Sequence, residues 1–273
     1  ETRAVSLARH VVVGAQVVGG LLALGCGALA FGLALGLQRG HKRVLPAQAA
    51  QSRTIERYSA CKLGDRMYVS MKLELDPLTR ELAAFEAPLG RVLDVGCGRG
   101  QFSLFLKELE LAHSVEGFDW DPRKVSVAQQ AARGDGRYWV GDVLHPELPA
   151  SDTILVFDVL HYLELPAQRE LVACLTRSLA TGGCLLIREM DGHAGWGSRL
   201  GQWFERLATK IGYNRARQGL NFQPIRALTD QLEALGFECS VRGRSGSRWS
   251  APNVLIVARQ KLPACDPAEP VLR

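Results

Sequence analysis

An apolar strand that runs straight into three alternate glycines constrains the fold of this chain more than any other feature. The stretch is Arg91-Val-Leu-Asp-Val-Gly-Cys-Gly-Arg-Gly100. Glycine adopts the positive φ angles of a tight turn and lets a ligand approach the backbone closely. Open α/β folds bind ligands at the carboxyl ends of their strands, which is where this turn would lie. The stretch therefore predicts a sheet with a ligand site at one edge.

Short apolar runs alternate with helical stretches through the rest of the chain. We expect strands at residues 91–95, 115–119, 138–140, 153–157, 184–188, 237–241 and 254–258. We expect helices at 101–109, 122–132 and 166–179, and a later helix that closes at 229–235. This alternation is typical of β-α-β units, and no helix separates the last two strands. The predicted class is α/β, a doubly wound, Rossmann-like sheet of seven strands with an antiparallel C-terminal edge hairpin.

The charges are spread unevenly along the chain. The formal net charge is +5, and residues 1–57 account for all of it with seven basic and two acidic residues. From residue 58 onward the charges balance, so the globular part has no net field that would attract a polyanion, and nucleic acid is not an expected partner. Seven cysteines, an odd number without a C-x-x-C pair, predict neither a disulfide framework nor a metal site.

Residues 11–37 form a long apolar run, and no charged residue lies between His10 and Gln38. About 20 helical residues cross a hydrocarbon core of ~30 Å, so this run is long enough to cross with tilt. We expect a transmembrane anchor within residues 1–44, a linker or short helix at 45–62, the α/β domain at 63–262 and a tail at 263–273. A cleaved signal sequence and a buried helix of the domain are the alternatives.

Two further expectations concern this N-terminal segment. Ala28, Gly32 and Gly36 lie at four-residue spacing, so one face of the helix could pack against another helix in the membrane. More basic residues follow the run than precede it, which places the C-terminal domain in the cytosol. Because residue 1 is Glu, we also expect that the chain lacks its original start or was processed.

The glycine turn resembles the first motif of class I S-adenosylmethionine-dependent methyltransferases, in which apolar residues, an acid and alternate glycines follow one another. Arg91 departs from that pattern at its first apolar position. A nicotinamide dinucleotide site would need Gly at position 101, where this chain has Gln101. The resemblance implies S-adenosyl-L-methionine as cofactor, with its methionine end on the loop. The implied loop residues are Asp94, Gly96, Cys97, Gly98 and Gly100.

The resemblance also implies cofactor contacts at the ends of later strands. Asp119 would accept hydrogen bonds from the two ribose hydroxyls, Trp120 would contact adenine, and Asp142 would meet the adenine amino group. The remaining implied residues are Val143, beside Asp142, and Asp158, after the fourth strand. Each feature alone has a plainer explanation, such as a simple turn for the glycines. We expect Asp94, Asp119 and Asp142 to converge on one cofactor.

The end of the fourth strand normally faces the transferred methyl group in this family. The chain lacks the Asn/Asp-Pro-Pro-Tyr/Phe signature of amide and adenine N-methyltransferases, and Val159-Leu-His161 is similar to small-molecule O-methyltransferases. His161 is therefore the first candidate for a general base, with a structural role as the alternative. Asp191 and His193, beside Glu189 on the same rim, are further catalytic candidates, with a solvated loop as the alternative.

Aromatic and arginine side chains gather in residues 195–222, where this fold usually carries its acceptor lid. A helix packed on the sheet is the alternative for this segment. We expect a membrane-anchored methyltransferase that acts on oxygen of a small, lipid-soluble or membrane-associated acceptor. The C-terminal pattern, with residues 253–259, resembles methyltransferases of aryl-polyene pigment clusters. A cofactor-binding membrane scaffold without catalysis is the alternative function.

Overall fold

The computed structural model describes residues 44–146, 148–190, 220–242 and 253–261. The predicted membrane span at 11–37, most of the predicted lid, the tail, Asp191 and His193 lie outside the described residues. Among the described helices, none combines the length and the apolar character that crossing a bilayer requires. The described residues from Leu45 onward belong to one compact unit.

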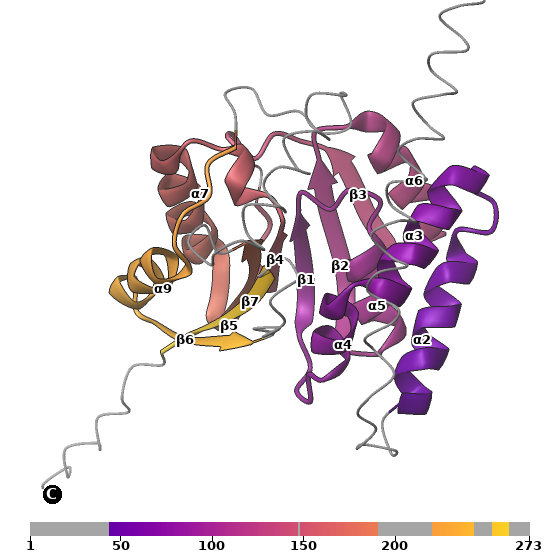
Figure 1. Ribbon diagram of the computed structural model, residues 1–273, viewed down its shortest axis with the longest axis horizontal. Helices are drawn as coiled ribbons and strands as arrows, with labels where there is room; N and C mark the ends of the chain where they lie inside the picture. Colours follow the sequence, from indigo (N-terminus) through magenta and orange to yellow (C-terminus); the bar gives the residue numbers. More distant parts are fainter. Residues whose placement is uncertain (1–43, 147, 191–219, 243–252, 262–273) are drawn as a thin grey trace, which may run out of the picture. The chain divides into compact units, whose positions relative to one another are not determined.

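Seven strands form one mixed sheet in the order β3-β2-β1-β4-β5-β7-β6 (Figure 1). Their bounds are β1 Gly90–Val95, β2 Ala112–Asp119, β3 Gly136–Val140, β4 Ser151–Phe157, β5 Leu179–Met190, β6 Phe237–Arg242 and β7 Asn253–Gln260. Strands β1 to β5 pair in parallel, whereas β7 lies antiparallel between β5 and β6. The predicted α/β, Rossmann-like sheet with an antiparallel C-terminal hairpin is confirmed.

Helices cover both faces of the sheet (Figure 1). One face packs against α2 Val44–Arg57, α3 Leu63–Leu75, α4 Pro77–Ala83, α5 Gln101–Glu108 and α6 Pro122–Ala132. The other face packs against α7 Leu165–Ser178 and α9 Ile225–Ala234. Alternate residues along β1 go to the two faces: Val92 joins the first apolar cluster and Leu93 the second. This is the period-2 alternation of a strand that is buried on both sides.

The segment that we expected to be a linker or a short helix contains helix α2 and packs onto the domain. Ala50 and Tyr58 are fully buried in the first apolar cluster. Arg57 Nε pairs with Glu108 Oε1 over 2.6 Å, and the Tyr58 hydroxyl donates to the Arg99 carbonyl over 2.7 Å. Helices α3 and α4, which the sequence analysis did not predict, continue this layer and bring further side chains to the carboxyl edge of the sheet.

Candidate functional site

The loops that follow β1, β2 and β3 are joined by hydrogen bonds at the carboxyl edge of the sheet. The Gly96 and Cys97 amides donate to the Phe118 carbonyl over 2.9 and 3.0 Å. The Gly98 amide donates to Asp119 Oδ2 over 2.9 Å, and the Gly141 amide donates to the Asp119 carbonyl over 3.1 Å. Asp119 therefore links three loops that lie apart in the sequence.

The three glycines of the turn all have positive φ: 72° at Gly96, 55° at Gly98 and 75° at Gly100. A Cβ atom at Gly96 would overlap Val159, so packing against the end of β4 requires glycine there. A Cβ atom at Gly98 would meet nothing within 4 Å. The backbone at Gly98 therefore faces open space, as a loop that receives a ligand must.

Asp119 is buried, and backbone amides hold both of its carboxylate oxygens. Oδ2 accepts from Gly98, and Oδ1 accepts from the Asp121 amide over 2.9 Å. Each carboxylate oxygen has a second acceptor position, so the group can also take hydrogen bonds from a pair of ligand hydroxyls. Trp120, the next residue, is 39% exposed. The pair fits the predicted contacts with a ribose and a purine, which stay predictions.

Asp94 points into the domain and not toward the open edge. Its Oδ2 accepts a hydrogen bond from Ser103 Oγ over 2.7 Å, and that hydroxyl lies 3.0 Å from Tyr138 Oη. Burial raises the pKa of the Asp94 carboxyl to about 7; the charge of Asp119 adds to the increase and the Ser103 hydrogen bond opposes it. Asp94 thus ties β1 to α5 and β3, and its predicted contact with a ligand ammonium stays a prediction.

Asp142 and Cys97 have different surroundings within the same set of loops. Asp142 is exposed, directly follows Gly141, and accepts the Leu144 amide at Oδ1 over 3.0 Å. Val143, which lies between Asp142 and Leu144 in the sequence, is partly buried against the second apolar cluster. Cys97 is buried, which raises the pKa of its thiol. The structure thus places Asp94, Asp119 and Asp142 at the ends of neighbouring strands.

His161 and Glu189 form a buried pair where β4 and β5 end. His161 Nδ1 lies 2.7 Å from Glu189 Oε2. Glu189 Oε1 accepts the Val159 and Leu160 amides over 3.1 and 2.8 Å. With a proton on Nδ1, the ring donates to Glu189, and Nε2 is then the nitrogen that can accept a proton.

Aromatic rings enclose the histidine. The ring of Phe222 stacks on His161 at 5.0 Å between centroids, and the ring of Tyr162 lies at 4.2 Å. The His161 carbonyl accepts the Asn221 amide over 2.8 Å. The sequence had placed Glu189 only on the rim beside Asp191 and His193. The structure extends β5 to Met190, so Glu189 lies inside a strand and its side chain faces His161.

Four charged side chains meet on the other face of the same strand ends. Arg188 Nη1 pairs with Asp76 Oδ2 over 2.7 Å, and Arg188 Nε lies 3.2 Å from Asp158 Oδ1. Lys72 Nζ lies 2.7 Å from Asp76 Oδ2 and 4.0 Å from Asp158 Oδ2. We call these four residues the charge cluster. Among these four residues, only Asp158 has a site role predicted from the sequence, as a cofactor ligand, and that role stays a prediction.

Asp158 has an unusual backbone conformation, with φ of 59°. Its amide donates to the Arg188 carbonyl over 3.0 Å, and its carboxylate faces the guanidinium of the same residue. Glu110 and Arg133 also have positive φ, but both lie just beyond the ends of helices, where this conformation is common. Positive φ at a strand end is uncommon and tends to occur at functional sites.

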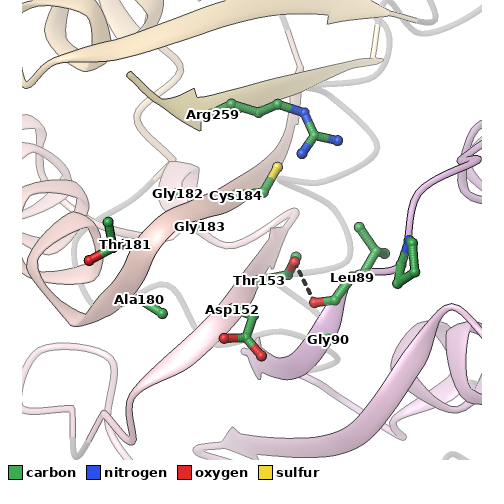
Figure 2. Close-up of a pocket in the computed structure, with 11 residues that line it drawn as sticks. Leu89, Gly90, Asp152, Thr153, Ala180, Thr181, Gly182, Gly183, Cys184 and Arg259 are labelled. Atoms are coloured by element: carbon green, nitrogen blue, oxygen red, sulfur yellow. Dashed lines mark hydrogen bonds between the residues drawn. The ribbon is translucent and has the colours of Figure 1, made fainter. Parts of the chain in front are cut away.

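The hollow drawn in Figure 2 lies at the opposite edge, where β1, β4 and β5 begin and β7 ends. Its volume is about 210 Å³. The Thr153 hydroxyl donates to the Leu89 carbonyl over 2.8 Å within it, and Asp152 is paired with Arg91. These partners lie at the amino ends of the strands, so the hollow is separate from the glycine turn and from His161.

The family model described as "Methyltransferase domain" matches residues 69–240. The chain is 26% identical over 152 residues to the carboxy-S-adenosyl-L-methionine synthase of Campylobacter curvus, a match that covers 54% of this chain and 63% of the relative. It is 34% identical over 103 residues to the trans-aconitate 2-methyltransferase of Methylobacterium nodulans, covering 37% and 38%. The chain thus spans less than two thirds of each of these two relatives.

Solved structures share the fold at low sequence identity. An O-methyltransferase family protein from Burkholderia thailandensis has a TM-score of 0.56 and 16% identity, over 80% of this chain and 67% of that one. The N-methyltransferase NodS from Bradyrhizobium japonicum, solved with S-adenosyl-L-homocysteine, has a TM-score of 0.52 and 16% identity, over 78% and 98%.

Proposed function

Because the chain belongs to the methyltransferase domain family, we propose that it transfers a methyl group from S-adenosyl-L-methionine to oxygen of a small acceptor. The resemblance to class I S-adenosylmethionine-dependent methyltransferases is confirmed by the family match and by the shared fold. One observation carries the proposal: the glycine turn and Asp119 form a hydrogen-bonded junction beside the strand end that carries His161.

The residues of this junction fit the cofactor. Open space at Gly98 admits a ligand to the backbone, and Asp119 keeps an acceptor position on each carboxylate oxygen. Trp120 adds an exposed aromatic surface next to Asp119. When bound, the cofactor supplies an electrophilic methyl group. The chain's own contribution is to hold that methyl group and the acceptor in line, which can account for most of a methyl-transfer rate.

His161 is the general base in this proposal. Glu189 holds Nδ1 at 2.7 Å and is itself fixed by two backbone amides, so the imidazole has one orientation. In this role Nε2 would take the proton of the acceptor hydroxyl as its oxygen reacts with the methyl group that the cofactor would supply. A positioned base contributes typically 10²–10⁴-fold to such a reaction.

The proposal includes a membrane anchor at residues 11–37, with the domain on the cytosolic face and a lipid-soluble or membrane-associated acceptor. Its support is the uncharged 27-residue run and the excess of basic residues after it. Replacing both Leu24 and Leu29 with Arg should release the full chain from membranes into the soluble fraction, since each charge costs about 3 kcal/mol at the centre of a span.

The matched control replaces Leu63 and Leu75, two exposed leucines of α3, with Arg. This variant should stay with the membranes after alkaline carbonate washing, as the unaltered chain does. Recovery of the unaltered chain in the soluble fraction would contradict the anchor.

Isotopically labelled S-adenosyl-L-methionine tests the enzymatic function directly. The full chain is incubated with a membrane extract, and labelled methyl groups are sought by mass spectrometry. The proposal predicts a labelled product that forms much more slowly, at a cofactor concentration near the affinity of the unaltered chain, when Asp119→Ala replaces it. Cofactor binding without any labelled product would favour the non-catalytic scaffold instead.

A further inference from the structure

Arg99 lies inside the glycine turn but is held by residues from outside it. Its carbonyl accepts a hydrogen bond over 2.7 Å from the hydroxyl of Tyr58, a fully buried residue that directly follows α2. Its Nε donates to Asp65 Oδ1 over 2.8 Å, and its guanidinium carbon lies 4.3 Å from the centroid of the Tyr68 ring. Asp65 and Tyr68 belong to α3. The helical layer before the sheet therefore holds Arg99 through both its backbone and its side chain.

The turn is thus held on two sides. On one side, the Gly98 amide donates to Asp119 Oδ2 over 2.9 Å. On the other side, the contacts of Arg99 fix the backbone between Gly98 and Gly100. Both glycines lack a Cβ atom, so their own conformational preferences are weak. The conformation of this part of the turn therefore depends on what its neighbours contact.

The contact between Arg99 and α3 is shielded from solvent. The side chain of Arg99 is 15% exposed and that of Asp65 is 19% exposed. Tyr68 covers the guanidinium with its ring, which adds a cation–π contact to the ion pair. A pair that is shielded in this way loses less to water than an exposed ion pair does. It can therefore hold the turn in one position.

The corner that joins α2 to α3 is itself attached to the domain. Gln130 Nε2 donates to the Ala60 carbonyl over 3.1 Å, and Arg133 Nη2 donates to the Glu56 carbonyl over 2.8 Å. Gln130 belongs to α6 and Arg133 ends it. Helix α3 also packs against α5, which begins directly after the turn (Figure 1). The groups that hold Arg99 therefore have a fixed support.

We propose that Asp65 and Tyr68 are positioning residues for the cofactor. They hold Arg99, and through it they keep the backbone of the turn in the conformation that receives the methionine end of S-adenosyl-L-methionine. The inference rests on the proposed function, since it needs the cofactor at the turn. It adds two residues that lie outside the glycine motif, and it makes α3 a part of the cofactor site.

Calorimetric titration of the full chain with S-adenosyl-L-methionine tests this role. Arg99→Met removes both side-chain contacts and should weaken cofactor binding about tenfold. Asp65→Asn and Tyr68→Leu should each weaken it about 3- to 5-fold, in line with what one shielded ion pair or one cation–π contact contributes. Tyr68→Phe should bind as the unaltered chain does, because the ring remains over the guanidinium.

A double variant separates an effect through Arg99 from a direct effect on the cofactor. If Asp65 acts through Arg99, Asp65→Asn should weaken binding no further in a chain that already carries Arg99→Met. Additive losses would overturn the inference, because Asp65 would then act on the cofactor without Arg99. Unchanged cofactor affinity in Arg99→Met would overturn it as well.

Glu74→Gln is the matched control, since it removes the same charge from the same helix. Glu74 Oε1 accepts a hydrogen bond from Ser70 within α3 over 2.7 Å. This variant should leave cofactor binding unchanged, and an equal loss in Glu74→Gln and Asp65→Asn would assign the effect to charge alone and contradict the inference. Urea unfolding of each variant is measured beside the titration. A lower free energy of unfolding in Asp65→Asn without any change in cofactor affinity would leave Asp65 a structural residue and contradict the inference.

The unaltered chain distinguishes this failure from that of the proposed function. An unaltered chain that does not bind the cofactor contradicts both. An unaltered chain that binds it, with equal affinity in all the variants, contradicts only the role of Asp65 and Tyr68.

Discussion

The two halves of the carboxyl edge are built in different ways. At the ends of β1, β2 and β3, the contacts are made by backbone amides and one carboxylate, Asp119, as in the Gly98–Asp119 hydrogen bond between residues 21 positions apart. At the ends of β4 and β5, side-chain charges from distant elements meet, as in the Arg188–Asp76 pair, whose members are 112 positions apart. After the roles that we propose for them, we call these the cofactor half and the acceptor half.

The difference teaches where each function is encoded. The conformation of the turn after β1 depends on glycines at fixed positions within one short stretch. A motif of this kind can be recognised from the sequence. The acceptor half depends on which side chains the tertiary fold brings together. Substitutions in the acceptor half should therefore change chemistry or stability, and substitutions in the cofactor half should change cofactor affinity.

The largest effect is expected for His161 and Glu189, the pair to which the proposed function gives the role in catalysis. His161→Ala should lower the turnover rate about 10²–10⁴-fold, because it removes the base, and should leave cofactor affinity within a few-fold of the original. Glu189→Gln should lower the rate less, since the amide can still hold the imidazole. Initial-rate measurements with a labelled cofactor check both. An undiminished rate in His161→Ala would leave the histidine with a structural role alone.

Arg188→Met tests the charge cluster as a source of stability. Removing one partner of a buried ion pair leaves Asp76 with less compensation, which should lower the free energy of unfolding by about 3–5 kcal/mol. Arg91→Met is the control, because its pair with Asp152 is exposed and should contribute little to the free energy of unfolding. Urea unfolding measures both. Similar losses in the two variants would contradict the description of the Arg188–Asp76 pair, whose side chains are each 7% exposed, as buried and tight.

The sequence predicted the sheet and the position of the glycine turn well, for physical reasons. The strands are apolar runs bounded by turn residues, and the three glycines after residue 95 mark the end of β1. The first strand was predicted at 91–95 and found at Gly90–Val95. Strand β5 begins earlier than the predicted residue 184, because Leu179 and its neighbours pair with β4 through an irregular register.

The acceptor half was harder to predict because its residues act through tertiary contacts. Helix α3 buries only Val69 and Leu73, and its apolar residues do not follow a clear helical period. The sequence therefore predicts neither this helix nor the position of Lys72 within it. The local role of Asp76 is to cap helix α4, where its side chain accepts a hydrogen bond from the Leu78 amide. That role does not indicate its contact with Arg188. Glu189 was placed on a loop because the end of β5 could not be located from its apolar residues alone.

The titration of Asp94 gives a test within the cofactor half. The pKa of this carboxyl is raised to about 7 in the folded state from an ordinary value of 3.8. Between about pH 4 and pH 7 the folded state therefore keeps a proton that the unfolded state has lost. The contribution of Asp94 to the free energy of unfolding is fully present below about pH 4 and is lost as the pH rises through about 7. Asp94→Asn should flatten the pH dependence of the unfolding free energy in that window. An unchanged slope would contradict the burial of a carboxyl there.

Two glycine substitutions separate packing from ligand access in the turn. Gly96→Ala combines positive φ with an overlap on Val159 and should lower the unfolding free energy by about 2–4 kcal/mol. Gly98→Ala has only the backbone strain and should lose about 1–2 kcal/mol, yet its methyl group would project into the open space and weaken cofactor binding. Equal losses of stability would show that Val159 does not restrict the turn.

Calorimetric titration of Asp119→Ala with S-adenosyl-L-methionine tests most directly whether the cofactor half binds the cofactor. Asp119→Ala should bind it about 10- to 100-fold more weakly, since hydrogen bonds to a charged group are lost. Asp152→Ala, which removes an acid at the opposite edge of the sheet, should bind as the unaltered chain does. Equal affinity in Asp119→Ala and the unaltered chain would contradict the assignment of this edge as the cofactor site.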